Sequence, residues 1–204
     1  MLTTSVYIPV AAARRLNIVC GADTNPSDVK IEYIAPDASA TTIATLHLAA
    51  NGTDRHRVDH NHAAFASGHG MIRLEATNPN PSDFYAFLAE SGDAFPVSGK
   101  AFLGSAFRVP YVSINSGAQK IRVAISNPNT AAIAVSVENL ATGNTTNLNL
   151  QPLTTALWDS EALGQAVITN SAIRILSTGG DAAVSAVISR NNNAFNSYPA
   201  VYGS

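Results

Sequence analysis

Apolar and polar residues alternate with a period of two in several short segments of the chain. In the clearest segment, Val29, Ile31 and Tyr33 alternate with Lys30 and Glu32. Successive side chains of a β-strand point to opposite faces, so this pattern predicts a strand with one buried face. The same alternation predicts two further strands, around Phe84, Ala86 and Leu88 and around Ile133, Val135 and Val137.

Clusters of turn-forming residues separate the alternating segments. Asparagine, glycine, serine and proline are common in turns because they favour positive φ, fix φ or bond to the nearby backbone. Such clusters lie at residues 24–27, 50–53, 78–81, 142–144 and 178–181. Many short strands separated by turns are typical of all-β sandwiches. The one segment that resembles a helix, at residues 160–164, predicts a single turn beginning at Asp159 or Ser160.

An internal repeat with a period of about 100 residues organises the chain. Seven short segments recur in the same order, and they include an apolar-Pro pair, an Asn-Pro pair, the alternating strand and an apolar strand that contains an arginine. The clearest matches are Ile8-Pro9 with Val109-Pro110, Asn25-Pro26 with Asn127-Pro128, Val29, Ile31 and Tyr33 with Ile133, Val135 and Val137, and Arg73 with Arg174. We therefore expect two tandem antiparallel β-sandwiches of Ig-like or jelly-roll type, at residues 1–105 and 106–204, with about seven strands each.

The low charge of the chain limits the kinds of partner that it can bind. Of the 204 residues, 46% are hydrophobic and 13% are charged, and the formal net charge is -2. The apolar share supports a packed core, and the charged share is about half that of a typical soluble domain. A nucleic-acid binder that neutralises phosphates needs a basic surplus, so we expect no nucleic-acid partner. Residues 106–204 hold only five basic and four acidic side chains. A surface with so few charges loses little hydration free energy when it is buried against another protein.

Cysteine content and the apolar segments suggest where the protein is made. Cys20 is the single cysteine and lies in an apolar run, so the chain forms no internal disulfide and we expect a buried side chain. The sequence begins without a basic region followed by a long apolar stretch, which is the pattern of a secretory signal. Membrane helices need about 18 apolar residues in a row. No segment of this sequence approaches that length, so we expect no membrane partner. These features predict synthesis in the cytoplasm, with a virion as one destination.

Four histidines within residues 55–69 form the most unusual polar segment. His56, His60, His62 and His69 include a pair two residues apart, which would share one face of a strand. With Asp59 they could supply three ligands to a zinc ion, so they are weak candidates for a metal site. The alternative is a polar loop, which the repeat favours because the matching residues 155–160 contain no histidine. We therefore expect no metal and no cofactor.

Motifs of catalysis are missing from the sequence. It contains no Gly-x-Ser-x-Gly elbow, P-loop, dinucleotide fingerprint or EF-hand loop, so we expect a protein that is not an enzyme. The candidates for contact with a partner are five aromatic residues in terminal and linking segments and one near the end of an expected strand: Tyr7, Phe95, Phe102, Tyr198 and Tyr202, and Trp158. For Trp158 the alternative is core packing. The segments expected to make such contacts are residues 2–10, 95–105 and 198–204.

These expectations favour a non-enzymatic structural protein that binds itself or a repeated protein lattice. A phage or virus particle component, such as a capsid decoration (cement) protein or a head or tail accessory protein, combines the expected properties. The alternative is a carbohydrate-binding or adhesin-like module, with a glycan as partner. Because β-sandwiches host both functions, the fold alone does not choose between them.

Overall fold

The computed structural model describes most of the chain, and almost all of the described residues lie in strands or turns. In β7, β8, β17 and β18, and at the ends of several other strands, the backbone alone is described. The described residues are 4–10, 16–58, 62–64, 68–76, 84–90, 93–97, 103–114, 119–159, 168–190, 193–199 and 201–202. The expected all-β class is confirmed.

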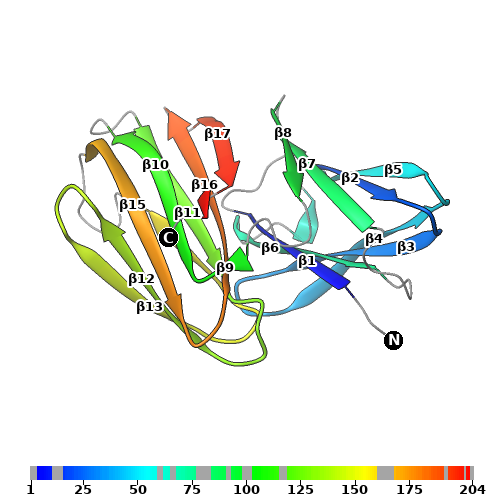
Figure 1. Ribbon diagram of the computed structural model, residues 1–204, viewed down its shortest axis with the longest axis horizontal. Helices are drawn as coiled ribbons and strands as arrows, with labels where there is room; N and C mark the ends of the chain where they lie inside the picture. Colours follow the sequence, from blue (N-terminus) through cyan, green and yellow to red (C-terminus); the bar gives the residue numbers. More distant parts are fainter. Residues whose placement is uncertain are drawn as a thin grey trace.

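The first half of the chain forms two four-stranded antiparallel sheets (Figure 1). The β3 sheet has the order β1-β6-β3-β4, and the β2 sheet has the order β5-β2-β7-β8. The strands are β1 (Thr4–Val10), β2 (Leu16–Ala22), β3 (Ser27–Ile34), β4 (Ala40–Leu48), β5 (Thr53–Val58), β6 (Gly70–Ala76), β7 (Phe84–Glu90) and β8 (Asp93–Val97).

The second half also forms two antiparallel sheets. The β12 sheet has the order β13-β12-β15-β10-β18, and the β11 sheet has the order β14-β11-β16-β17, with the short β9 also pairing with β16. The strands are β9 (Leu103–Gly104), β10 (Ala106–Ile114), β11 (Gln119–Ser126), β12 (Ile133–Asn139), β13 (Thr145–Leu150), β14 (Thr155–Asp159), β15 (Ile168–Thr178), β16 (Ala182–Arg190), β17 (Asn193–Pro199) and β18 (Val201–Tyr202). When β10 to β17 are matched in chain order to β1 to β8, the two halves have the same strand order.

Each half packs its two sheets around a buried apolar cluster, as in a sandwich. In the first half the strand from Val29 to Tyr33 contributes its alternating apolar side chains, as expected, and Cys20 lies in the same cluster with no exposure. In the second half Ile133, Val135 and Val137 occupy the matching core. Burial of this apolar surface is the main favourable term for folding, at about 25 cal/mol per Å².

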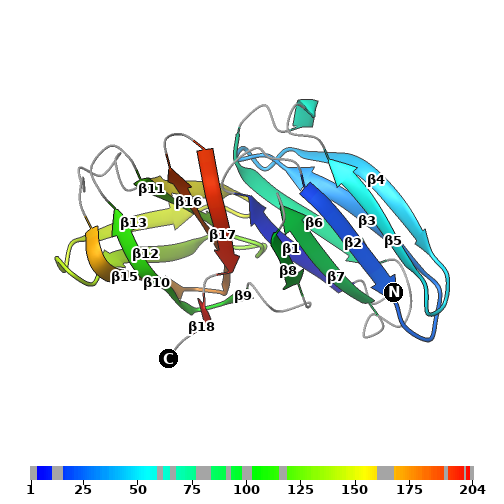
Figure 2. The same cartoon turned by 90° about the horizontal axis from the view of Figure 1, so that it is seen from above.

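The β11 sheet is buried on both of its faces. Val123 and Ile125 of β11 point into the core of the second half, whereas Ala124 and Ser126, on the opposite face, are also fully buried. β16 repeats this arrangement, because Ala183 belongs to the buried cluster of the first half while its neighbours face the second. The first half therefore covers the outer face of this sheet, with β1 and β6 beside it (Figures 1 and 2).

A buried hydrogen bond joins the halves at this contact. The Ser185 hydroxyl of β16 donates to the backbone oxygen of Pro9 in β1 at 2.7 Å. Pro9 lies on an edge strand, where the missing N–H of proline is tolerated. The side chains of β11 and β16 at the contact are alanine and serine, and such small side chains let two sheets approach closely.

Two details of the sequence interpretation change. Cross-strand pairing places Glu32 opposite Arg73 and Glu138 opposite Arg174, so Glu32 matches Glu138. The expected match of Val29 with Ile133 is therefore displaced by two residues. The first half also has eight strands rather than about seven in the part of the chain that the structure describes. The helical turn expected at residues 160–164 lies outside the described residues, and the boundary near Ser105 stays a prediction.

Candidate interaction surface

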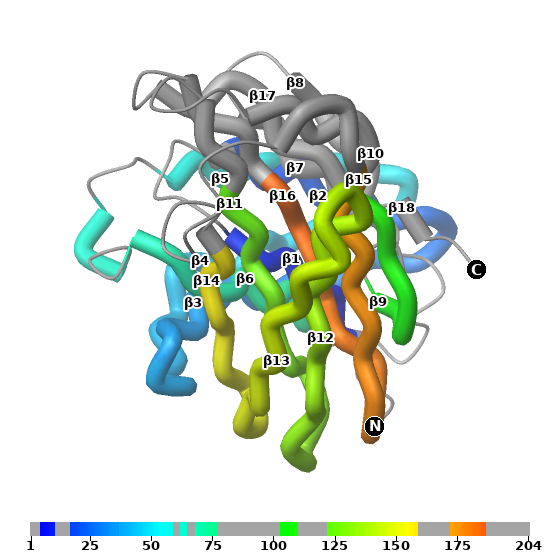
Figure 3. The backbone as a smooth tube through the Cα atoms, turned by 90° about the vertical axis from the view of Figure 1, so that its left-hand side faces the viewer, coloured from blue at the N-terminus to red at the C-terminus, as the bar shows by residue number. Residues whose placement is uncertain are grey.

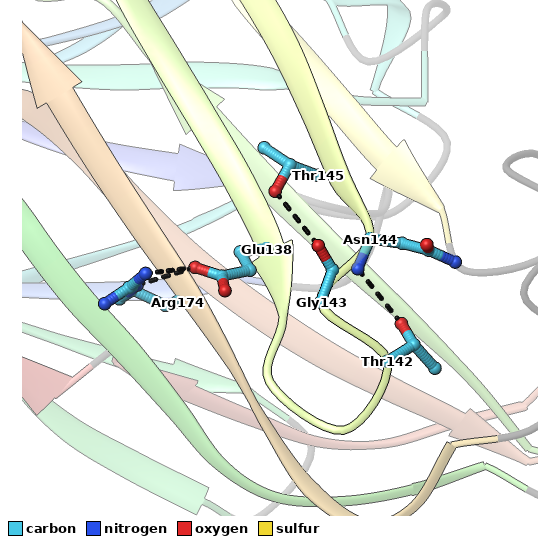
Figure 4. Close-up of polar contacts among 6 residues, drawn as sticks. All are labelled: Glu138, Thr142, Gly143, Asn144, Thr145 and Arg174. Atoms are coloured by element: carbon cyan, nitrogen blue, oxygen red, sulfur yellow. Dashed lines mark hydrogen bonds and ion pairs between the residues drawn. The ribbon is translucent and has the colours of Figure 1, made fainter.

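A cross-strand ion pair marks the centre of the exposed face of the β12 sheet. The Arg174 Nε of β15 donates to Oε2 of Glu138 on β12 at 2.8 Å, and the Arg174 Nη2 donates to the same oxygen (Figure 4). The Glu138 side chain is 22% exposed and the Arg174 side chain 42% exposed. An exposed ion pair contributes at most about 1 kcal/mol to stability, so its main effect here is to fix the two side chains.

The face around this pair is polar but weakly charged. Cross-strand registers align its residues in rows of β13, β12, β15 and β10 positions. The row of the ion pair adds Thr145 on one side and Arg108 on the other, and the next row holds Asn147, Ser136, Leu176 and Ala106. In Figure 3 this sheet faces the viewer. Small and amide side chains therefore surround a few larger ones on an open surface.

Two leucines on this face are exposed. Leu140 is 40% and Leu176 is 37% exposed, and among the described side chains they are the exposed large hydrophobic residues. Leu176 alternates with the buried Ile175, so it points outward beside Arg174. Leu140 directly follows β12, and its N–H donates to the Ala172 oxygen at 3.0 Å, which continues the ladder. Exposed apolar residues gathered on one face are typical of a contact surface.

The matching face of the first half is covered. Glu32 and Arg73 form the corresponding ion pair, with Arg73 Nε donating to Glu32 Oε2 at 2.8 Å. Ile34 and Met71 pair one step further along the ladder, in the positions that Leu140 and Ala172 occupy in the second half. Both side chains are fully buried, although they point away from the core of the first half. β6, which carries Met71, contacts β11 and β14.

Burial changes the electrostatics of the first-half pair. Glu32 is 4% exposed, and its carboxylate also lies 2.6 Å from Lys30 Nζ. Burial by itself raises the pKa of Glu32, but hydrogen bonds from Lys30 and Arg73 outweigh this effect and lower its pKa. Burial likewise disfavours the charged form of Arg73, and its bonds to Glu32 raise its pKa instead. Both groups therefore stay ionised at neutral pH.

The histidine segment does not assemble into a metal site among the described residues. His56 lies half-buried on β5, His62 is exposed, and the backbone oxygen of His69 accepts a hydrogen bond from the Tyr33 hydroxyl. His60 lies outside the described residues. No group of three or more histidine, cysteine, aspartate or glutamate side chains that could hold a metal is found in the part of the chain that the structure describes.

Trp158 is placed in the core. It is 3% exposed within the cluster of the second half, so it offers no aromatic platform at the surface. Its position on β14 puts it opposite Val123 on the neighbouring strand, where alternation turns it inward. The core alternative for Trp158 therefore replaces its expected role in contact with a partner.

The remaining aromatic candidates lie in strands or outside the described residues. Tyr7 is half-buried on β1 and packs against the first core. Phe95, Tyr198 and Tyr202 lie in β8, β17 and β18, where the backbone alone is described. Phe102 lies outside the described residues. The contact roles of these five residues stay predictions.

The described parts of the segments expected to bind a partner also pair with strands of the same chain, and their contact with a partner stays a prediction. β1 pairs with β6, β9 pairs with β16, and the tail strands β17 and β18 pair with β16 and β10. The described part of the tail thus adds strands to both sheets of the second half. Leu140 and Leu176 do not stand out in the sequence, because an isolated leucine near a strand is indistinguishable from a core residue. Matching Glu32 with Glu138, in place of Val29 with Ile133, aligns Ile34 with Leu140.

Comparison with known proteins gives no relative to guide this assignment. The chain matches no family model and no curated protein. Among the described residues, no helix has the length and apolar character needed to cross a membrane. The candidate surface therefore rests on the geometry of the β12 sheet alone.

Proposed function

We propose that the protein is a non-enzymatic structural protein that joins a larger assembly through the exposed face of the β12 sheet. The observation that carries this proposal is the pair of exposed leucines on one weakly charged face, whose counterpart in the first half is covered. Burying apolar surface drives association, and a face with few charges loses little hydration when it is covered.

The most specific form of this proposal is a phage or virus particle component. A capsid decoration (cement) protein or a head or tail accessory protein makes many equivalent contacts with a lattice or with sister copies. Rigid sandwiches suit this task, because their interface backbones change little on binding. Low charge supports such contacts between proteins, and it does not support nucleic-acid binding.

Duplication of one sandwich is part of the proposal. Three observations support it: the matching strand orders, the recurring Glu–Arg pair, and the equivalent positions of Ile34 and Leu140. The eight strands that match between the halves, β1–β8 and β10–β17, agree in number with a jelly roll. The adjacent pairs β2–β5 and β3–β6 agree with the B–E and C–F pairs of an Ig-like domain. The two units are residues 1–105 and 106–204.

The test measures whether the chain is present in particles purified from its natural source. We expect purified particles to contain the chain in a fixed ratio to the main shell protein. The double variant Leu140→Glu with Leu176→Glu should stay folded and be lost from the particles, because it places two charges on the contact face. A control variant, Thr45→Glu on exposed β4, should be incorporated normally.

Two results would count against this function. The wild-type chain could be missing from particles, or the double variant could be incorporated like the control. The glycan-binding alternative has lost Trp158 as a surface platform. Binding to a glycan panel that survives the double substitution would restore that alternative.

A further inference from the structure

We infer that the exposed face of the β12 sheet binds the same face of a second copy of this chain around a two-fold axis. The axis runs parallel to the strands, between β12 and β15. This inference rests on the proposed function, since it names the first partner of the proposed contact face. It makes the isolated protein a symmetric dimer with one shared interface, in which the same patch is used by both copies.

The cross-strand register defines the pattern that the two copies would share. β12 and β15 are neighbours, and three successive rows pair Leu140 with Ala172, Glu138 with Arg174, and Ser136 with Leu176. Alternation puts all of these side chains on the outer face, because Val137 and Ile175 between them are buried in the core. The two outer rows each pair a leucine with a small residue, and the middle row pairs an acidic with a basic residue.

The proposed axis exchanges the two strands without changing the row. Each exposed leucine then meets a small residue of the other copy: Leu140 lies over Ala172, and Leu176 lies over Ser136. Sheets pack face to face at about 10 Å, and large side chains opposite small ones fill that space without clashes or voids. The two leucines of each copy are therefore covered by the interface.

The ion pair supplies charge complementarity for the same axis. Glu138 of one copy lies over Arg174 of the other, so four charges of alternating sign form a closed ring. A two-fold axis that runs across the strands and through the ion pair would instead place glutamate over glutamate and arginine over arginine. Like charges in contact at an interface oppose association, so this register is rejected.

The flanking strands are compatible with the proposed axis. It places Arg108 of β10 over Thr145 of β13, and Ala106 over Asn147, in the other copy. Each of these pairs joins side chains that do not repel. The first half offers no comparable face among its described side chains, because its matching positions, Ile34 and Met71, are already buried.

The experiment measures the mass of the full chain in solution by light scattering, with two charge-reversed variants. One chain has a mass of 21.2 kDa, and the wild type should have about twice this mass. Glu138→Arg and Arg174→Glu should each lose the dimer. Each substitution gives positions 138 and 174 the same charge, so the two side chains of one copy repel those of the other. An equimolar mixture should restore it, because two basic side chains of one variant then lie over two acidic side chains of the other.

Controls separate loss of binding from loss of folding. Circular dichroism and a melting curve should show that each variant is folded. Leu176→Glu, which breaks no pair within the chain, should also lose the dimer, and Thr45→Arg on exposed β4 should keep it. A wild-type monomer at every concentration, or a mixture that stays monomeric, overturns the inference.

The two proposals fail separately. A chain that is monomeric alone but incorporated into particles would overturn the dimer and leave the structural function in place. A dimer that never enters particles would support the interface and contradict the proposed function.

Discussion

Glu32 shows how a single buried charge is tolerated in this protein. Its side chain is almost fully covered, yet Lys30 and Arg73 both lie within hydrogen-bond distance of its carboxylate. A buried charge without partners would cost several kcal/mol, so the carboxylate, the ammonium and the guanidinium depend on each other. Cys20 is the opposite case: burial, followed by the charge of Asp54, raises the pKa of its thiol to about 12. The thiol therefore stays protonated and unreactive at neutral pH.

The lowered pKa of Glu32 predicts a loss of stability in acid. A carboxyl whose pKa is lower in the folded state stabilises the fold above the pKa of the unfolded chain. This contribution is lost as the pH falls through the folded-state pKa. Glu32→Gln should reduce the free energy of unfolding at neutral pH by about 2 kcal/mol. The variant should also lose less stability than the wild type as the pH falls below about 5.

Urea unfolding at a series of pH values measures both effects. Glu75→Gln, which removes a carboxylate from β6, the strand that carries Arg73, serves as the control and should retain the wild-type dependence in acid. If the free energy of unfolding of the wild type and of Glu32→Gln fell equally steeply in acid, the stabilising role of the Glu32–Arg73 pair would be contradicted.

At the scale of the element, the start of β6 depends on a close approach to β3. A Cβ atom built on Gly70 would lie 2.5 Å from the Tyr33 hydroxyl oxygen and 2.6 Å from the Ile34 backbone oxygen. Neither neighbour can move easily, because Tyr33 is buried and donates to the His69 oxygen, and Ile34 belongs to the paired strand. Glycine is therefore required at this position for space rather than for its backbone angles.

Gly70→Ala should destabilise the protein. The added methyl group forces β6 away from β3, and overpacking of this kind typically costs about 1–3 kcal/mol. Chemical unfolding measures the loss. Gly143→Asn is the matched control, since Gly143 has a φ of +73° and open space around it, and asparagine accepts that backbone conformation. A loss in the control as large as in Gly70→Ala would contradict the steric explanation.

At the scale of the whole molecule, the halves are joined through a sheet that is buried on both sides. Ala124, Ser126, Ala183 and Ser185 are small side chains on the outer face of the β11 sheet. The hydroxyls of Ser126 and Thr155 bond to each other there at 2.7 Å, so the polar groups of this contact are satisfied. The same kind of sheet face on the β12 side stays open, and it is the face that we propose for assembly.

Ala183→Leu should loosen the contact between the halves. Ala183 is fully buried in the cluster of the first half, so a larger side chain must push β1 away from β16. We expect a loss of about 1–3 kcal/mol. Calorimetry should show one unfolding transition for the wild type and two separated transitions for the variant. Ala40→Leu, at an exposed position of β4, is the control and should unfold like the wild type. Retention of a single, unshifted transition in Ala183→Leu would show that the halves do not depend on this contact.

The sequence by itself determined the strands and their inner faces. Alternation at Val29, Ile31 and Tyr33 and at Ile133, Val135 and Val137 identified core positions, and the structure confirms all six. The buried Cys20 and the turns at residues 50–53 and 142–144 were also predicted correctly. These features are local: the period of two and the turn residues depend on neighbours along the chain.

Only the tertiary structure decided which outer faces are covered. A shift of two residues leaves an alternating pattern unchanged, so the sequence pattern matched Val29 with Ile133 and did not show that Leu140 and Ile34 occupy equivalent ladder positions. Burial of Ile34 and exposure of Leu140 depend on whether another sheet packs there, and strands distant in sequence decide this. The same reason explains Ala183 and Trp158, whose surroundings come from long-range packing. The candidate surface is therefore a property of the folded molecule, because two similar strand patterns acquire different exposure only when the halves pack together.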